Sequence, residues 1–165
     1  SIMKLAALGD SIIKGVLFTQ EDNGRGHYSL SDLNIADRVA SRMHCEVVNL
    51  GKMGCTIEAG ERILDRHLAR LEGAKYVLMC YGGNDSDYNW RAIADNPKAE
   101  HIPNTSLHVF EKTVIAQFQN YARAKSNSHK HQYHLCINAP QSVSSCTKTK
   151  AQTIFCPSAF GIGNE

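Results

Sequence analysis

Three short apolar segments, each followed directly by a glycine, constrain the fold of this chain most. They occupy residues 2–8, 46–50 and 75–81. Segments this short and this apolar are typical of buried strands. Amphipathic patterns with the helical period lie between them, and strands that alternate with helices form parallel sheets with helices on both faces. The sequence therefore predicts an α/β fold with a parallel sheet.

The remaining elements are predicted from periodicity and capping residues. Residues 12–29 are expected to form a loop, because Gly15, Gly24 and Gly26 interrupt them. The polar excursion at residues 85–104 is long enough to be functional. We expect helices over residues 31–43, from a cap at Thr56 to about Leu71, and from a cap at Thr105 or Ser106 onward, and a fourth strand over residues 134–139.

The length and the C-terminal composition define the domains. The chain has 165 residues, the length of one ordinary domain. We assign residues 1–140 to this domain and treat residues 141–165 as an atypical tail, because the tail has no clear period and Glu165 is its only acidic residue. We hypothesise that the chain is truncated or changes reading frame near Gln141.

The charge and hydropathy limit the classes of partner. A net charge of +2 does not indicate binding to nucleic acid or to a membrane surface. No apolar run approaches the length of a membrane span. Because the first strand begins at about Ile2, we expect no signal peptide and a cytoplasmic location.

The six cysteines do not predict a metal site. They stand at positions 45, 55, 80, 136, 146 and 156, and none forms a Cys-x-x-Cys pair. A structural zinc site is therefore poorly supported, and we expect buried free thiols in a reducing compartment. We expect no metal and no cofactor.

Polar groups suited to acyl transfer stand at the ends of the three strands. Ser11 supplies a hydroxyl that becomes a nucleophile when a base removes its proton. The backbone N–H of Gly54 and the side-chain amide of Asn84 are candidate donors to an oxyanion. Gly9 and Asp10 are expected to support the turn that carries Ser11. Each motif alone also occurs in ordinary turns, so the hypothesis rests on the three occurring in order.

These three motifs resemble the first three sequence blocks of the SGNH (GDSL-like) hydrolase family. The motifs are Gly-Asp-Ser at residues 9–11, Asn-x-Gly-x-x-Gly-x-Thr at 49–56 and Gly-Gly-Asn-Asp at 82–85. The continuation through Trp90 is similar to a bacterial lipase/esterase-like subgroup. The resemblance implies a flavodoxin-like three-layer α/β/α fold. It also implies that the protein hydrolyses an ester through an acyl-enzyme.

The resemblance also implies roles for individual residues. Ser11 would be the nucleophile, and its own N–H would join Gly54 and Asn84 in the oxyanion hole. Asp85 and Trp90 are further candidates for substrate binding. For Trp90 we slightly favour packing of the excursion onto the sheet edge, and the two roles are compatible. The implied substrate is a small ester, with a short acyl group or an acetylated carbohydrate. No cofactor is implied.

The sequence departs from the family at its C-terminal block. The family's general base and orienting acid lie in an Asp-x-x-His block, and no Asp-x-x-His occurs in this chain. His101 and His108 lie on the correct side of the sheet but have no evident carboxylate partner, so a substitute base is not favoured. His129, His131 and His134 precede the fourth strand and would lie on the opposite side from Ser11. The alternative function is therefore a catalytically impaired or truncated SGNH-fold protein that acts as a binding or non-enzymatic domain.

Two further expectations follow from the same observations. A nucleotide- or flavin-binding domain is disfavoured, because the first turn lacks the Gly-x-Gly-x-x-Gly and P-loop patterns. A sheet without the family's fifth strand would expose an apolar edge, so we expect the chain to self-associate.

Overall fold

A three-stranded parallel sheet forms the centre of the protein. The computed structural model describes residues 2–125, 134–135 and 152–153. β1 (Met3–Gly9) lies between β4 (Cys45–Asn49) and β5 (Ala74–Cys80), which gives the order β4-β1-β5. Both neighbours pair with β1 in the parallel sense.

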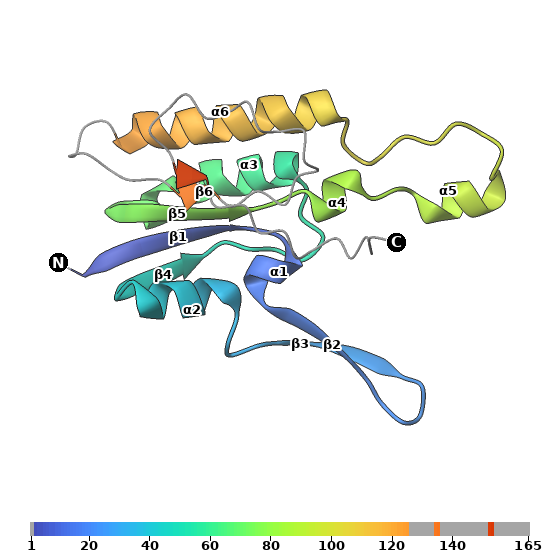
Figure 1. Cartoon of the computed structure of the whole chain (residues 1–165), viewed down its shortest axis with the longest axis horizontal. Coiled ribbons are helices and arrows are strands. Elements are labelled where there is room, and N and C mark those ends of the chain that lie inside the picture. The colour runs from blue at the N-terminus through green and yellow to red at the C-terminus, as the bar shows by residue number, and fades with distance from the viewer. Residues whose placement is uncertain (1, 126–133, 136–151, 154–165) are drawn as a thin grey trace.

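Helices cover both faces of this sheet (Figure 1). α2 (Ile35–Arg42) lies on one face, and α3 (Ile57–His67) and α6 (Leu107–Lys125) lie on the other. A 3₁₀ turn, η1 (Leu68–Leu71), continues α3. The three-layer α/β/α architecture expected from the sequence is confirmed.

The fourth predicted strand is described only in part. β6 (His134–Leu135) lies beside β5 and pairs in parallel with β7 (Gln152–Thr153). The rest of the predicted strand, residues 136–139, lies outside the described residues. So does the tail at 141–165, apart from β7, and its assignment as a separate segment stays a prediction.

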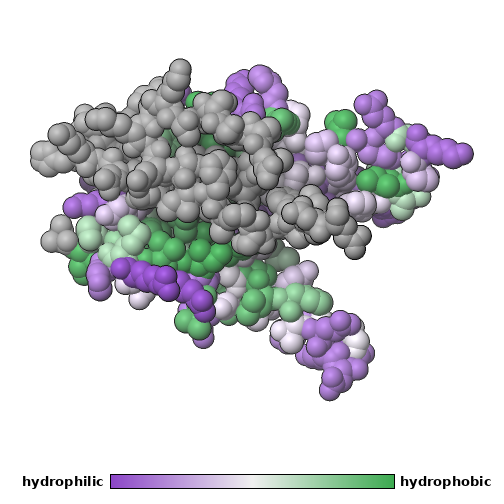
Figure 2. All heavy atoms as spheres, in the orientation of Figure 1, coloured by the Kyte–Doolittle hydropathy of each residue, from purple (hydrophilic) through white to green (hydrophobic). Residues whose placement is uncertain are grey.

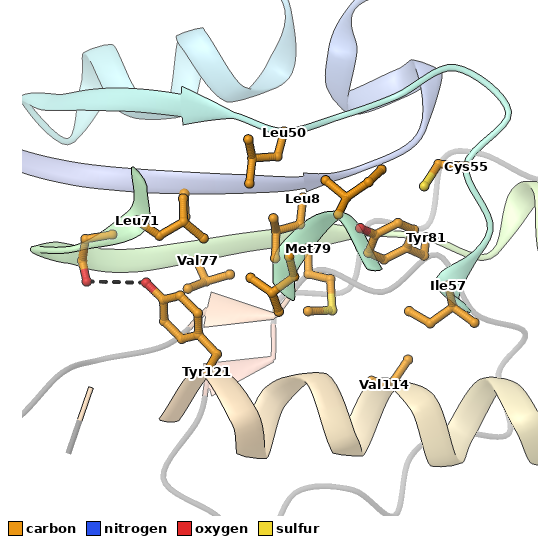
Figure 3. Packing of buried hydrophobic residues seen from close by; sticks show 14 of the residues in the cluster. Leu8, Leu50, Cys55, Ile57, Leu71, Val77, Met79, Tyr81, Val114 and Tyr121 are labelled. Atoms are coloured by element: carbon orange, nitrogen blue, oxygen red, sulfur yellow. Dashed lines mark hydrogen bonds between the residues drawn. The ribbon is translucent and has the colours of Figure 1, made fainter. Parts of the chain in front are cut away.

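The sheet is buried on both faces because the C-terminal halves of β1 and β5 carry consecutive apolar residues. Leu5 and Ala7 pack toward α2, whereas Ala6 and Leu8 pack toward α3 and α6. Figure 3 shows the larger of the two clusters, in which Leu8 lies among side chains of β5, α3 and α6. Successive strand residues point to opposite faces, so a continuous apolar run produces two cores. This packing holds β1 at the centre of the molecule.

Helix starts are fixed by the side chains that the sequence indicates. The side chain of Thr56 caps α3 by accepting from the backbone N–H of Ala59, as predicted. Asn34 caps α2 in the same way. Of the two candidates for α6, Ser106 supplies the hydroxyl oxygen that accepts from Val109. Such caps satisfy N–H groups that have no partner within the helix.

The prediction of a loop over residues 12–29 is wrong. The segment contains a short helix, α1 (Ser11–Lys14), and a hairpin of β2 (Val16–Gln20) and β3 (Gly26–Leu30). The glycines that suggested a loop have specific conformational roles. Gly15 ends α1 with a φ of 79°, and Gly24 lies in the turn with a φ of 78°.

The hairpin projects from the end of the molecule that holds α1 (Figure 1). Phe18 pairs with Tyr28 across the two strands, and their ring centroids lie 5.2 Å apart. Both rings remain largely exposed. In Figure 2 the tip of the hairpin is hydrophilic, whereas hydrophobic residues gather toward its base.

The excursion at 85–104 contains two short helices, α4 (Gly83–Ser86) and α5 (Trp90–Asp95). The expectation that Trp90 packs onto the sheet edge is wrong, because its side chain is 64% exposed. The indole N–H donates to Asp87 at 2.7 Å, and the ring meets Tyr88 edge-on. Local contacts within the excursion therefore hold the ring.

In the described part of the chain, none of the helices is long and apolar enough to cross a bilayer.

Gly60 generates a test of the packing between α3 and β5. A Cβ at Gly60 would lie within 2.2–2.6 Å of three side-chain atoms of Tyr81, which is buried. We expect Gly60→Ala to lower the free energy of unfolding by about 1–3 kcal/mol, because overpacking of a buried contact outweighs the gain in helix propensity. Urea denaturation measures this change, and Arg62→Ala on the exposed side of α3 is the control. A Gly60→Ala protein as stable as the control would contradict the packing.

Candidate active site

The ends of β1, β4 and β5 bring three glycine-containing loops to one place. The register pairs Ala7 with Asn49 and Gly9 with Cys80, so all three strands end at nearly the same level. Beyond the strands, the backbone N–H of Lys52 donates to Gly9 at 3.1 Å. Ligands of open α/β sheets bind at this edge, which makes it the candidate site.

Ser11 is the first residue of α1 and is separated from β1 by Asp10 alone. Asp10 caps this short helix, and its Oδ1 accepts from the backbone N–H of Ile12 at 2.9 Å. The backbone N–H of Asp10 donates to Cys80 at 3.3 Å. Asp10 thus caps the turn, and the turn leaves the Ser11 side chain half-buried at the edge of the sheet.

Gly9 is required where β1 passes closest to β5. A Cβ at this position would lie 2.4 Å from the carbonyl oxygen of Cys80 and 3.0 Å from the side chain of Ile13. Real side chains do not make contacts this short with backbone atoms. Gly9 therefore allows the turn before Ser11 to lie against the neighbouring strand.

The loop that carries Gly54 is tied to α1 through Asn49. The Asn49 side chain accepts from Gly51 N–H at 2.9 Å and donates to the carbonyl of Ile13 at 2.8 Å. Gly54 itself is exposed and has a φ of 73°, a backbone conformation that residues other than glycine rarely adopt. A backbone N–H at this position is not hindered by a side chain.

Asn84 lies in α4, beside the Gly54 loop. Its side-chain Nδ2 donates to the carbonyl of Cys55 at 3.1 Å. A side-chain amide has two N–H hydrogens, so this contact leaves one available for a ligand. The structure thus places Asn84 next to the residue that follows Gly54, and brings together the loops of Ser11, Gly54 and Asn84.

Asp85 makes a contact that the sequence did not suggest. It is only 3% exposed, and its two carboxylate oxygens lie 3.0 and 3.1 Å from the backbone nitrogen of Ile57. This carboxylate therefore occupies the N-terminus of α3, where negative charge is stabilised. The contact with Ile57 joins residues 28 positions apart and had no signal in the sequence.

Burial raises the pKa of two groups near the site. Desolvation is the main cause of the raised pKa of the Asp10 carboxyl, and the nearby charge of Asp85 adds to it. Burial likewise raises the pKa of the Cys55 thiol. The thiol stays protonated at neutral pH, so Cys55 does not compete with Ser11 as a nucleophile.

In the described part of the chain, neither His101 nor His108 forms a hydrogen bond with Ser11. The ring nitrogen Nε2 of His101 lies 2.7 Å from the carbonyl of Asn96. His108 is exposed at the start of α6. Across residues 2–125, 134–135 and 152–153, no cluster of three or more His, Cys, Asp or Glu side chains suited to a metal is found.

A cavity of about 230 Å³ lies between α4 and the start of α6. Its lining is mainly apolar and was not identified from the sequence, because the residues come from two segments about twenty positions apart. Trp90 is not among them. The lining residues are Gly82, Asp85, Ser86, Tyr88, Pro103, Thr105, Leu107 and Phe110.

Asp10 gives a test with a definite sign. Because its pKa is raised above 3.8 in the folded state, the folded chain binds more protons than the unfolded chain just above that pH, and stability falls as pH rises through this window. Asn can still accept from Ile12 but does not ionise. We expect the free energy of unfolding of the unmodified chain, relative to Asp10→Asn, to increase as pH falls from 7 toward 4. Urea denaturation across this range measures it, and a constant difference would contradict the raised pKa.

Comparison with solved structures places this site in a known fold. The chain resembles a lipase/acylhydrolase from Enterococcus faecalis, with 21% identity and a TM-score of 0.52 over 82% of this chain and 56% of the other. It resembles the SGNH-hydrolase family esterase AlinE4, with 17% identity and a TM-score of 0.57 over 85% and 61% of the two chains. A lipase from a goat rumen metagenome gives 15% identity and a TM-score of 0.56 over 81% and 63%.

The chain thus spans about 56–63% of the length of these structures. No curated protein sequence matches it. The model of the GDSL-like lipase/acylhydrolase family matches residues 5–154, which include all three motif loops. On this match, together with the shared α/β/α fold, the chain belongs to the GDSL-like lipase/acylhydrolase family.

Proposed function

We propose that this chain is a serine ester hydrolase domain in which Ser11 is the nucleophile. One observation carries the proposal. The loops of Ser11, Gly54 and Asn84 are bonded to one another at the end of the sheet, and Asn84 keeps one amide hydrogen for a ligand. Membership of the GDSL-like family supports the same reaction.

The reaction proceeds in two steps. The Ser11 hydroxyl attacks the ester carbonyl, and the negative charge that develops on oxygen is held by the N–H groups of Ser11 and Gly54 and by the Asn84 amide. The carbon–oxygen bond to the alcohol then breaks, the alcohol leaves with the proton given up by the Ser11 hydroxyl, and an acyl-Ser11 intermediate remains. Water attacks this intermediate, and the acid leaves with Ser11 regenerated.

A short acyl group is the proposed substrate specificity. The cavity beside Asp85 and Tyr88 measures about 230 Å³ and is lined mainly by apolar atoms. Pockets for drug-sized ligands are larger, at roughly 300–1,000 Å³. A cavity of this size favours an acetyl or similarly short chain over a long fatty acyl chain.

Ligand binding without turnover is the second candidate function. The proton of the Ser11 hydroxyl must pass to a base, and the sequence contains no Asp-x-x-His segment to supply one. Within the described residues, no side chain forms a hydrogen bond with the Ser11 hydroxyl. The two candidates differ in whether Ser11 is required for hydrolysis.

Replacing Ser11 tests the first candidate. We expect Ser11→Ala to lower the rate of p-nitrophenyl acetate hydrolysis by about 10³-fold or more, because the acyl-enzyme cannot form. Ser41→Ala, on the exposed side of α2, is the matched control and should keep the rate of the unmodified chain. Equal rates for Ser11→Ala and the unmodified chain would instead favour binding without turnover.

Replacing Asn84 tests the oxyanion hole. Removal of one donor to the oxyanion typically lowers kcat by about 10²- to 10³-fold. We expect Asn84→Ala to show a loss in this range with a smaller change in KM, measured with the same ester. A change confined to KM would show that the amide binds the substrate but does not stabilise the oxyanion.

A further inference from the structure

Asp85 makes contacts that its place in the third motif does not explain. Its carboxylate is buried and accepts from the backbone N–H of Ile57, the first residue of α3, at 3.0 and 3.1 Å. The first N–H groups of a helix have no partner within the helix itself. Asp85 supplies that partner from α4, which lies 28 positions further along the chain.

A second bond runs beside this one. The side chain of Asn84 donates to the carbonyl of Cys55, so two consecutive residues of α4 are bonded to the segment at 55–57. On its other side, the same pair accepts from Asn104 and from the backbone N–H of Thr105, each at 3.0 Å. Asn84 and Asp85 are therefore held between two segments of the chain.

The segments on both sides of Gly54 are held by hydrogen bonds. Gly54 has no side chain and is exposed, with no atom within 4 Å of the place a Cβ would occupy. It lies in a turn closed by the backbone N–H of Cys55, which donates to the carbonyl of Lys52 at 3.1 Å. The residues that follow are held by Asn84, which donates to Cys55, and by Asp85, which accepts from Ile57.

We propose that Asp85 is a positioning residue that fixes the Gly54 N–H relative to the amide of Asn84. This inference rests on the proposed function of the same site. Asp85 acts through Ile57, because both of its carboxylate oxygens face that N–H. An error of about 1 Å in the placement of catalytic groups is sufficient to lower the rate about 10²-fold.

A purely structural helix cap would give different kinetics. Loss of such a cap lowers the stability of α3 and the fraction of folded enzyme, but the folded enzyme keeps its kcat. Loss of a positioning residue lowers kcat in folded enzyme and leaves KM nearly unchanged, because the donors act mainly on the transition state.

The experiment compares Asp85→Ala with Asp85→Asn on the full chain, with p-nitrophenyl acetate as the probe. Asp85→Ala removes the acceptor, and we expect kcat to fall about 10²-fold with KM within about twofold. Asn is as good as Asp at accepting from helix N–H groups, so Asp85→Asn should stay within about threefold of the unmodified kcat. Asp65→Asn, exposed on α3, is the control for charge.

Wild-type kcat in folded Asp85→Ala, or an equal loss in both Asp85 variants, overturns the proposal. If Asp85→Ala does not fold, hydrogen exchange on the unmodified chain decides, because the Ile57 amide is protected only if Asp85 holds it. Fast exchange at Ile57 in a chain with Ser11-dependent turnover overturns the positioning role alone. Absence of Ser11-dependent turnover overturns the proposed function and the positioning role with it.

Discussion

The burial of β1 between two helical layers is the constraint on which the rest of the structure depends. Leu5 and Ala7 face one layer, and Ala6 and Leu8 face the other. A strand with apolar side chains on both faces is stable only inside a sheet covered on both sides. Because β1 is central, its C-terminal end lies beside the ends of both neighbours, and Ser11 is placed at their junction.

Side chains at the end of β4 and in α4 then complete the site that the strands begin. Asn49, Asn84 and Asp85 each form a hydrogen bond to the backbone of a different segment. Such bonds hold the loop between β4 and α3 in one conformation, although the loop itself contains no helix or strand. This arrangement buries two carboxylates, Asp10 and Asp85, near each other. Burial raises the pKa of Asp10, and the charge of Asp85 raises it further.

Two elements outside the repeated strand–helix pattern project from the same end of the sheet. The β2-β3 hairpin and α5 both extend from the end that holds α1 and α4 (Figure 1). Their side chains pack little on the core, and Phe18, Tyr28 and Trp90 are more than half exposed. Loops at this end of an α/β sheet differ among proteins more than the strands do, because the core does not constrain them.

The sequence by itself determined the order of β1, β4 and β5 and of the helices α2, α3 and α6, together with the cap at Thr56 and the three motif loops. These depend on local patterns: apolar runs, helical period and capping residues. It did not predict the hairpin, whose glycines indicate a turn and a helix end only once the pairing of Phe18 with Tyr28 is known. Nor did it predict the exposure of Trp90. Only the tertiary structure decided that Asp85 binds the N-terminus of α3, because that contact joins α3 and α4, which follow β4 and β5 and are brought together by the packing of both strands beside β1.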